Sequence, residues 1–174
     1  PATSSDQSFS TKPAFHKAVA TIKEDCSIAT ATPCYESLSA WENDHGGIDF
    51  TSKECNKGDL VCRNVVAVAK IDGTWNNPDT NPVHFNNWTT DENNYIKVYT
   101  TDQARHNGKW DEDGYRLKVA NSENYTRPFA FPNSSHLYIH GIQVELTMST
   151  STTGNSAIAV LPDISGKGEI ILDS

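Results

Sequence analysis

The sequence predicts an all-β fold of stacked strands, a β-solenoid, and three observations support this prediction. Alternating apolar and polar residues recur in the runs Tyr95–Tyr99, Tyr115–Val119 and Leu137–Leu146, and a period of two is typical of strands with one buried face. The runs begin about 20 residues apart, close to the length of one solenoid coil. β-Branched residues fill the apolar runs, and turn-forming Ser, Thr, Asn and Asp are abundant. A β-sandwich is the alternative architecture, because short strands separated by turns also fit it.

Length and charge exclude several classes of function. The 174 residues suit one domain, and 36% hydrophobic residues is a low share for a globular chain. The formal charge of −8 argues against nucleic-acid binding, which needs a surplus of Lys and Arg to neutralise phosphates. No apolar run is long enough to span a bilayer, so we expect no membrane insertion. The negative charge is compatible with cation binding and equally with plain solubility.

Four cysteines form two close pairs in the sequence, Cys26 with Cys34 and Cys55 with Cys62. Neither pair has Cys-x-x-Cys spacing and no histidine cluster accompanies them, which argues against a zinc site. Two local disulfides fit better and imply an oxidising compartment, so we expect an extracellular or cell-surface location. Two alternatives stay open: pairing of Cys26 with Cys62 and of Cys34 with Cys55, or four free thiols in a cytosolic protein.

The chain is expected to divide into an N-terminal arm, residues 1–22, and a single β-rich domain, residues 23–174. The first residues of the arm are rich in Ser, Thr and Pro, and its end, Val19–Ile22, has the pattern of a strand. An arm followed by a strand can be donated to a neighbouring subunit by β-augmentation. Pairing within its own chain is the default expectation.

A short helix is expected to follow and to cap one end of the β core. Thr32-Pro33 fits its start, because Thr is a good N-cap and Pro suits the first helical position. Gly46-Gly47 fits its end. Aromatic and apolar residues at spacings of three predict a face turned to the core, rather than a ligand platform: Tyr35, Leu38 and Trp41.

The remaining elements are predicted from apolar runs and their breakers. Val65–Ile71 is almost continuously apolar, which predicts a strand covered on both faces. A long loop rich in Asn, Asp and Pro follows, through residue 94. Pro128 and Pro132 make Thr126–Phe131 a short or edge strand. Gly141 predicts a bulge or corner within its run. Two further short strands are predicted near the end of the chain: Ala157–Leu161 and Glu169–Leu172.

Several segments resemble the opening portion of right-handed parallel β-helix proteins, which are secreted or surface-exposed bacterial proteins related in fold to pectate lyases. The similar segments lie within about residues 20–172: Tyr35–Glu42, Asn94–Tyr99, Arg105–Asp111 with Tyr115–Leu117, and Leu137–Val144. The resemblance implies a capping helix followed by coils of parallel strands. It implies no particular activity, because most such proteins have none known.

From these observations we predict an extracellular structural subunit or surface module. The chain stops after the apolar strand at residues 168–174 without a polar cap, and a solenoid end needs a cover. We therefore expect either the rest of a longer surface protein or a second copy of the chain as partner. Arm exchange and end-to-end stacking would then give filaments. The alternative is a carbohydrate-binding or polysaccharide-degrading surface protein, with glycans as partners.

Calcium is the candidate cofactor, although none is expected to be required. Asp111 and Asp113 are two residues apart before a glycine, as in many calcium loops. Asp72 and Asp79 belong to a second oxygen-rich stretch with several asparagines. Ordinary turn chemistry explains both stretches at least as well, because Asp, Asn and Gly are the common turn residues.

Three tryptophans in loop-like regions are candidate sugar platforms, since aromatic faces stack on sugar rings: Trp75, Trp88 and Trp110. Loop-anchoring side chains packed on the core are the simpler interpretation. Enzyme activity is not expected, because we find no catalytic constellation. Polysaccharide lyase or hydrolase activity is the minor alternative, by analogy of fold. The arginines available to a lyase are Arg105, Arg116 and Arg127.

Three Asn-x-Ser/Thr triplets make the chain a candidate glycoprotein, beginning at Asn87, Asn124 and Asn133. Such triplets arise often by chance in a chain this rich in Asn, Ser and Thr. His136 and His140 are four apart in a predicted strand and would point to one face. Without a third ligand we interpret them as surface or turn residues rather than metal ligands.

Overall fold

The computed structural model describes residues 16–28, 30–48, 55–121, 126–132, 136–148, 153–161 and 170–173. These residues are mostly strand. The helical elements are short: α1 Leu38–Asn43, η1 His45–Gly47 and α2 Leu60–Arg63. The strands are β1 His16–Ile22, β2 Cys34–Tyr35, β3 Val65–Ile71, β4 Val83–His84, β5 Ile96–Thr100, β6 Arg116–Asn121, β7 Phe129–Pro132, β8 Leu137–His140, β9 Gln143–Met148, β10 Ile158–Leu161 and β11 Ile170–Asp173.

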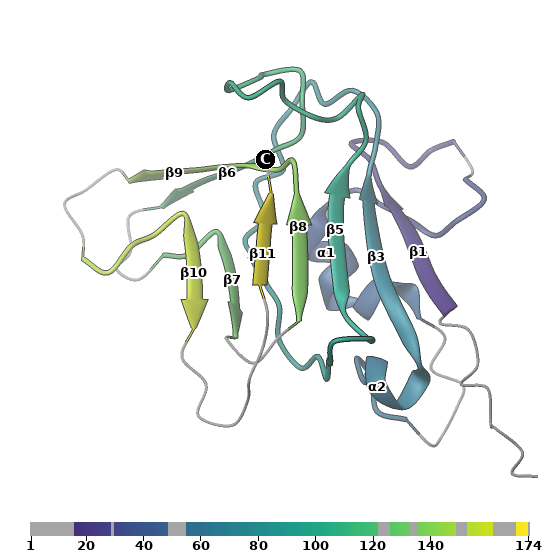
Figure 1. The fold of residues 1–174 in the computed structure, drawn as a ribbon. Helices are drawn as coiled ribbons and strands as arrows, with labels where there is room; N and C mark the ends of the chain where they lie inside the picture. The colour runs from purple at the N-terminus through teal and green to yellow at the C-terminus, as the bar shows by residue number, and fades with distance from the viewer. Residues whose placement is uncertain are drawn as a thin grey trace, which may run out of the picture.

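The described strands form three parallel sheets (Figure 1). The largest has the order β11-β8-β5-β3-β1-β2, the second β10-β7-β4, and the third pairs β6 with β9. Between β3 and β4 a single parallel bridge joins Asp79 to Leu117 of β6. From β3 on, the chain visits the three sheets in one order, and β8, β9 and β10 are added beside β5, β6 and β7. The predicted β-rich chain is confirmed. Its parallel pairing among the described strands differs from the antiparallel sheets of a sandwich.

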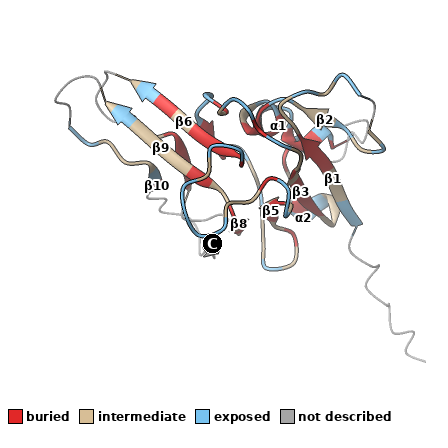
Figure 2. Ribbon diagram, turned by 90° about the horizontal axis from the view of Figure 1, so that it is seen from above, coloured by how far each residue is buried: buried red, intermediate tan, exposed pale blue. Residues whose placement is uncertain are grey.

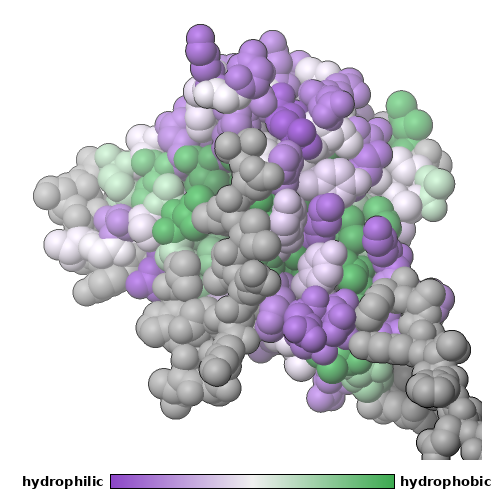
Figure 3. Space-filling view, viewed as in Figure 1, coloured by the Kyte–Doolittle hydropathy of each residue, from purple (hydrophilic) through white to green (hydrophobic). Residues whose placement is uncertain are grey.

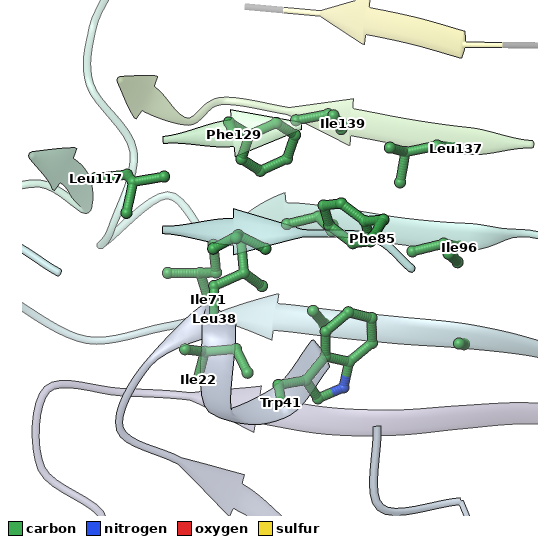
Figure 4. Close-up of a cluster of buried hydrophobic side chains, with 14 of the residues drawn as sticks. Ile22, Leu38, Trp41, Ile71, Phe85, Ile96, Leu117, Phe129, Leu137 and Ile139 are labelled. Atoms are coloured by element: carbon green, nitrogen blue, oxygen red, sulfur yellow. The ribbon is translucent and has the colours of Figure 1, made fainter. Parts of the chain in front are cut away.

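The core lies between the sheets, where inward-facing residues of neighbouring strands stack in register. Ala69 of β3 is opposite Val98 of β5, and Val98 is opposite Ile139 of β8. All three are at most 2% exposed. In Figure 4, side chains of the same kind lie above one another, such as Phe129 above Phe85. Each pass of the chain thus buries the apolar face of the previous one, which is the main source of stability expected here.

The outward face of the six-stranded sheet is mixed in polarity. In the view of Figure 3, hydrophilic residues cover the upper part and hydrophobic patches lie between them. Lys97 of β5 places its Nζ 5.2 Å from the ring centroid of Tyr99 and 5.4 Å from that of Tyr138. These aromatic rings are half-buried, and the ammonium over their faces gains a modest cation–π attraction.

The three alternating runs are strands, but they do not all stack on one another. The first and third contribute the neighbours β5 and β8, whereas the second is β6 in another sheet. The predicted interval of about 20 residues is therefore wrong as a coil length. The third run also divides at Gly141 (φ 72°) into β8 and β9, which lie in different sheets. A side chain there would collide with Thr100 and Arg105, so this corner requires glycine.

The first helix begins later than predicted. Cys34-Tyr35 pairs with the end of β1 as β2, which keeps the backbone extended. Ser37 is the N-cap instead of Thr32, and its Oγ accepts from Ala40 N at 3.0 Å. The helix ends before the predicted stop at Gly46-Gly47, because α1 ends at Asn43 with Asp44 as its C-cap, and Gly46 (φ 74°) lies inside η1. Neither η1 nor α2 was predicted, because such short turns leave no periodic pattern.

β7 was predicted as a short or edge strand. It is short, with four residues, but it is interior, between β10 and β4. Its prolines are at or before its ends, where the loss of one N–H does not interrupt the ladder. β1 is interior too. It pairs over seven residues with β3 and on its other edge with β2, both of the same chain, which agrees with the default expectation. Residues 1–15 of the predicted arm lie outside the described residues.

Two disulfides close short loops, as the local spacing predicts: Cys26 with Cys34 and Cys55 with Cys62. Their presence fits an oxidising compartment. The first ties the turn after β1 to β2. The second spans the segment that contains Gly58 and leads into α2. No helix in the described part of the chain is long and apolar enough to cross a membrane.

Candidate functional site

An open polar cavity of about 540 Å³ lies beside the start of α1, between that helix and the loop after β3. Its wall includes three carboxylates, two amides and an indole: Glu24, Glu36, Asp79, Asn77, Asn81 and Trp75. No Lys or Arg lines the cavity among the described residues. The site is therefore negatively charged and rich in oxygen and amide groups.

Glu24 fixes the loop to the end of β1. Its Oε2 accepts from the backbone N of Asn76 at 2.7 Å, and its Oε1 accepts from the backbone N of Asn77 at 3.1 Å. The side-chain amide of Asn77 donates to Oε1 at 2.6 Å, and that of Asn76 to Oε2 at 3.3 Å. These hydrogen bonds, the Asn77 side chain first, lower the pKa of Glu24. Glu24 therefore stays ionised at the rim of the cavity.

Asp79 joins the same loop to α1. Unlike Glu24, it is buried, with only 4% of its surface exposed. Its Oδ2 accepts from Leu38 N at 2.9 Å and from the Tyr115 hydroxyl at 3.2 Å, and its Oδ1 accepts from Asn81 N at 3.1 Å. Burial raises the pKa of Asp79 and outweighs these bonds, which act to lower it. Two carboxylates on one cavity thus have opposite pKa shifts, one lowered by hydrogen bonds and the other raised by burial.

The loop after β3, which forms part of the cavity wall, is held by Arg116, which is 4% exposed. Its Nη1 donates to Trp75 O at 2.9 Å, and its Nη2 donates to Asn76 O at 3.1 Å. Its Nε lies 2.8 Å from a carboxylate oxygen of Glu112. The guanidinium therefore holds the loop backbone, which leaves it little freedom to act as a lyase base. Arg105 is similarly engaged, with Nη2 donating to Thr100 O at 2.6 Å.

The three candidate tryptophans occupy different environments. Trp75 is 1% exposed and meets Tyr115 edge-on, with centroids 4.8 Å apart, so its faces belong to the core. Trp88 is half-buried and packs against Trp41 and other aromatic rings. Trp110 is 44% exposed, and its Nε1 donates to Glu112 Oε1 at 2.7 Å. Of the three, Trp110 offers the most surface to a ligand.

An aromatic cluster beside α1 anchors the loop that carries Trp88. The ring of Trp88 stacks on Trp41 at 5.7 Å and lies 4.9 Å from the ring of His45. Glu42, buried beneath them, accepts from Asn86 N at 3.0 Å and from Trp88 Nε1 at 3.2 Å. The predicted loop-anchoring role therefore describes Trp88 well. Burial lowers the pKa of His45.

The candidate calcium ligands are engaged in ordinary protein contacts. Asp72 accepts from Thr101 Oγ1 at 2.8 Å and pairs with Lys70 at 3.4 Å. Asp111 Oδ1 accepts from Asp113 N at 2.9 Å, which is a local turn bond. No group of three or more His, Cys, Asp or Glu side chains is placed to hold a metal in the part of the chain that the structure describes.

The other candidates are scattered. Asn87 is exposed in a left-handed turn (φ 62°), whereas Asn124 and Asn133 lie outside the described residues. His140 is the last residue of β8, and His136 is the residue immediately before this strand. The Arg127 carbonyl oxygen accepts from His84 Nε2 at 2.7 Å. Of these residues, those that the structure describes do not line the cavity.

Sequence reasoning missed Glu24 and Glu36 as members of one site. Glu24 contacts residues 52 and 53 positions later, a separation that no local pattern reveals. The asparagine-rich stretch around Asp79 was the available signal. Comparisons with models of protein families, with curated proteins and with solved structures found no match to this chain.

Proposed function

We propose that the chain is an extracellular structural module that folds as a short right-handed parallel β-helix. The observation that carries this proposal is the order of the strands: the chain passes through three sheets in turn and adds each later strand parallel to its earlier counterpart. Parallel strands joined by crossovers are right-handed in about 98% of cases, which supports the handedness. Two disulfides support the compartment.

α1 supports the role of a cap at the first pass. It packs against β1, β2 and β4, and its apolar residues Leu38 and Trp41 are fully buried. A stacked array needs a cover on its terminal repeat, because an uncovered repeat exposes its core and its backbone. The opposite end of the described strands presents β9, β10 and β11 at the edges of the three sheets.

These three edges support end-to-end stacking as the mode of assembly. Parallel edge strands offer unpaired backbone groups to a further strand, which would come from a second copy or from more of the same protein. Arm exchange is less well supported. It would have to remove β1 from seven paired positions and expose Ala20 and Ile22, both fully buried.

Two matched substitutions test the stacking. Ile158 on β10 and Val61 on α2 are both aliphatic and 39% exposed, but only Ile158 lies on an edge strand. A lysine on an edge discourages pairing. We expect concentration-dependent oligomers or filaments from the wild type and from Val61→Lys, and monomers from Ile158→Lys. Light scattering with negative-stain microscopy measures both. A wild type that stays monomeric at high concentration contradicts self-assembly.

The polar cavity favours a second candidate, a carbohydrate-binding surface protein. Carboxylates and amides are the usual partners of sugar hydroxyls, and Trp110 supplies an exposed aromatic face elsewhere. Glu36→Gln should weaken glycan binding if the cavity is the site, and Trp110→Ala should weaken it if the indole is. A glycan array with both variants separates these outcomes, and an array without any hit contradicts the candidate. Lyase or hydrolase activity would be tested on the glycan that binds.

A further inference from the structure

We propose that Asn107 is a site of self-catalysed deamidation, in which the neighbouring His106 acts as the base. Asn107-Gly108 is the one Asn-Gly pair in the sequence, and it lies in the excursion between β5 and β6 (Figure 1). Both residues are exposed. The proposal is independent of the structural role proposed above.

Gly108 removes the usual steric obstacle to this reaction. In deamidation the backbone nitrogen of the following residue attacks the side-chain carbon of the asparagine. A side chain on that residue obstructs the approach, and glycine has none. Gly108 adopts φ 83°, and even an added Cβ would meet nothing within 4 Å. The space beside the Gly108 Cα is therefore open, and the Asn107 side chain makes no hydrogen bond within the described part of the chain.

His106 is placed to take the proton from the attacking nitrogen. Gly108 N donates to His106 Nδ1 at 3.0 Å. Nδ1 is placed as the acceptor of this bond, a role that an imidazole ring nitrogen can take when the hydrogen is on Nε2. A backbone N–H is a poor nucleophile until its proton is removed, and a base within hydrogen-bond reach is the group that removes it. The contact joins residues two apart in the sequence and depends on the bend of the backbone at residues 107–109.

The reaction balances with water as its only co-reactant. Gly108 N forms a bond to Cγ of Asn107 while its proton passes to His106 Nδ1. The Cγ–Nδ2 bond then breaks, and the proton on His106 moves to the departing amine, which leaves as ammonia. Water opens the resulting five-membered succinimide at either carbonyl, giving an aspartyl or an isoaspartyl linkage at position 107. The chain gains one negative charge beyond its formal −8, close to the exposed Trp110.

Peptide mapping by mass spectrometry tests the proposal on the full-length protein incubated at neutral pH. Asn56 and Asn86 are exposed and are followed by Lys57 and Asn87, so they serve as internal references. We expect Asn107 to deamidate faster than either. In the folded protein His106→Ala and His106→Gln should slow the reaction roughly tenfold, a modest share of the 10²–10⁴-fold that positioned bases contribute. His106→Gln keeps a hydrogen-bond acceptor but lacks a useful base.

The same variants in reduced, urea-denatured protein provide the matched control. There His106 has no fixed position, so wild type and variants should deamidate at equal rates. A wild-type rate in folded His106→Ala or His106→Gln would overturn the role of the base. An equal slowing in the folded and denatured states would also overturn it, because the effect would then belong to the sequence and not to the loop geometry. An unreactive Asn107 overturns the site itself.

Discussion

The region around α1 and the sheet of β6 and β9 are both built on parallel strands, yet different interactions hold them. Around α1, buried carboxylates bind groups far away in the sequence: Glu42 accepts from Trp88, and Asp79 accepts from Leu38 and Tyr115. The β6–β9 pair relies on a backbone ladder of six residue pairs. In Figure 2 buried residues extend through the α1 region, whereas β6 and β9 carry exposed residues toward their ends.

This difference indicates where single side chains matter. A buried carboxylate whose partners are backbone N–H groups leaves several donors unpaired when it is removed, and each costs free energy. A backbone ladder survives most side-chain changes, because its hydrogen bonds do not depend on residue type. The α1 region should therefore be sensitive to substitution, and the exposed ends of β6 and β9 tolerant of it.

The largest effect is expected from Trp41→Ala. Trp41 is fully buried, stacks on Trp88 and meets Phe85 edge-on at 6.5 Å. Removing such a side chain should lower the free energy of unfolding by about 3–5 kcal/mol. Urea denaturation followed by circular dichroism measures it. Trp110→Ala is the control, because Trp110 is 44% exposed and its loss should have little effect. Equal effects of the two substitutions would contradict the importance given to the cluster.

Asp79→Asn comes next, with an expected loss of about 1–3 kcal/mol. Both carboxylate oxygens accept hydrogen bonds, so an amide must turn its NH₂ toward a donor. The pH dependence has a definite sign. The pKa of Asp79 is raised above its ordinary 3.8 in the folded protein. The protonated carboxyl therefore stabilises the folded state at pH values below 3.8, and this stabilisation is lost as the pH rises through the folded-state pKa.

Denaturation of wild type and Asp79→Asn across acid to neutral pH measures this sign. The advantage of the wild type over the variant should be largest at acid pH and should shrink as pH rises. An advantage that grows as pH rises would show that the three hydrogen bonds, and not burial, dominate the environment of this carboxyl.

Glu24→Gln should have a smaller effect with the opposite pH dependence. Hydrogen bonds lower the pKa of Glu24 below its ordinary 4.5 in the folded protein. The ionised carboxylate therefore stabilises the folded state at pH values above 4.5, and this stabilisation is lost as the pH falls through the folded-state pKa. Solvent screens most of the interaction, because the carboxylate lies at the rim. The advantage of the wild type should therefore be seen at neutral pH and disappear in acid. Thermal unfolding at both ends of this range measures it, and a larger effect than that of Asp79→Asn would contradict the comparison.

The parts of this structure that the sequence predicts are those set by local pattern. The near-continuous apolar run at Val65–Ile71 coincides with β3 in both bounds, because burial on both faces leaves its mark in consecutive residues. The start of α1 was misplaced because Cys34-Tyr35 pairs with β1, and tertiary pairing overrides the local helix signals of Thr32-Pro33. The corner at Gly141 was foreseen, but not that it sends the chain into another sheet.

The candidate site was harder to predict than the strands. Asp79 was named from its oxygen-rich surroundings, yet its partner Leu38 lies 41 positions away. The bond from Asn77 to Glu24 spans 53 positions. Contacts of this kind arise only when the loop after β3 folds back over β1 and α1. A sequence pattern can identify carboxylates and amides, but which of them share a cavity is decided by the topology of the sheets.

The smallest effect is expected from Lys118→Met on β6. Lys118 Nζ lies 3.1 Å from a carboxylate oxygen of Glu145 on β9, and the two side chains are 40% and 34% exposed. Exposed pairs of this kind contribute about 0.2–1 kcal/mol, because water screens the charges and two long side chains lose freedom. The loss in unfolding free energy should fall further in high salt, which urea denaturation at two salt concentrations measures. A loss above about 2 kcal/mol that salt does not reduce would show that side chains, and not the backbone ladder, hold this sheet.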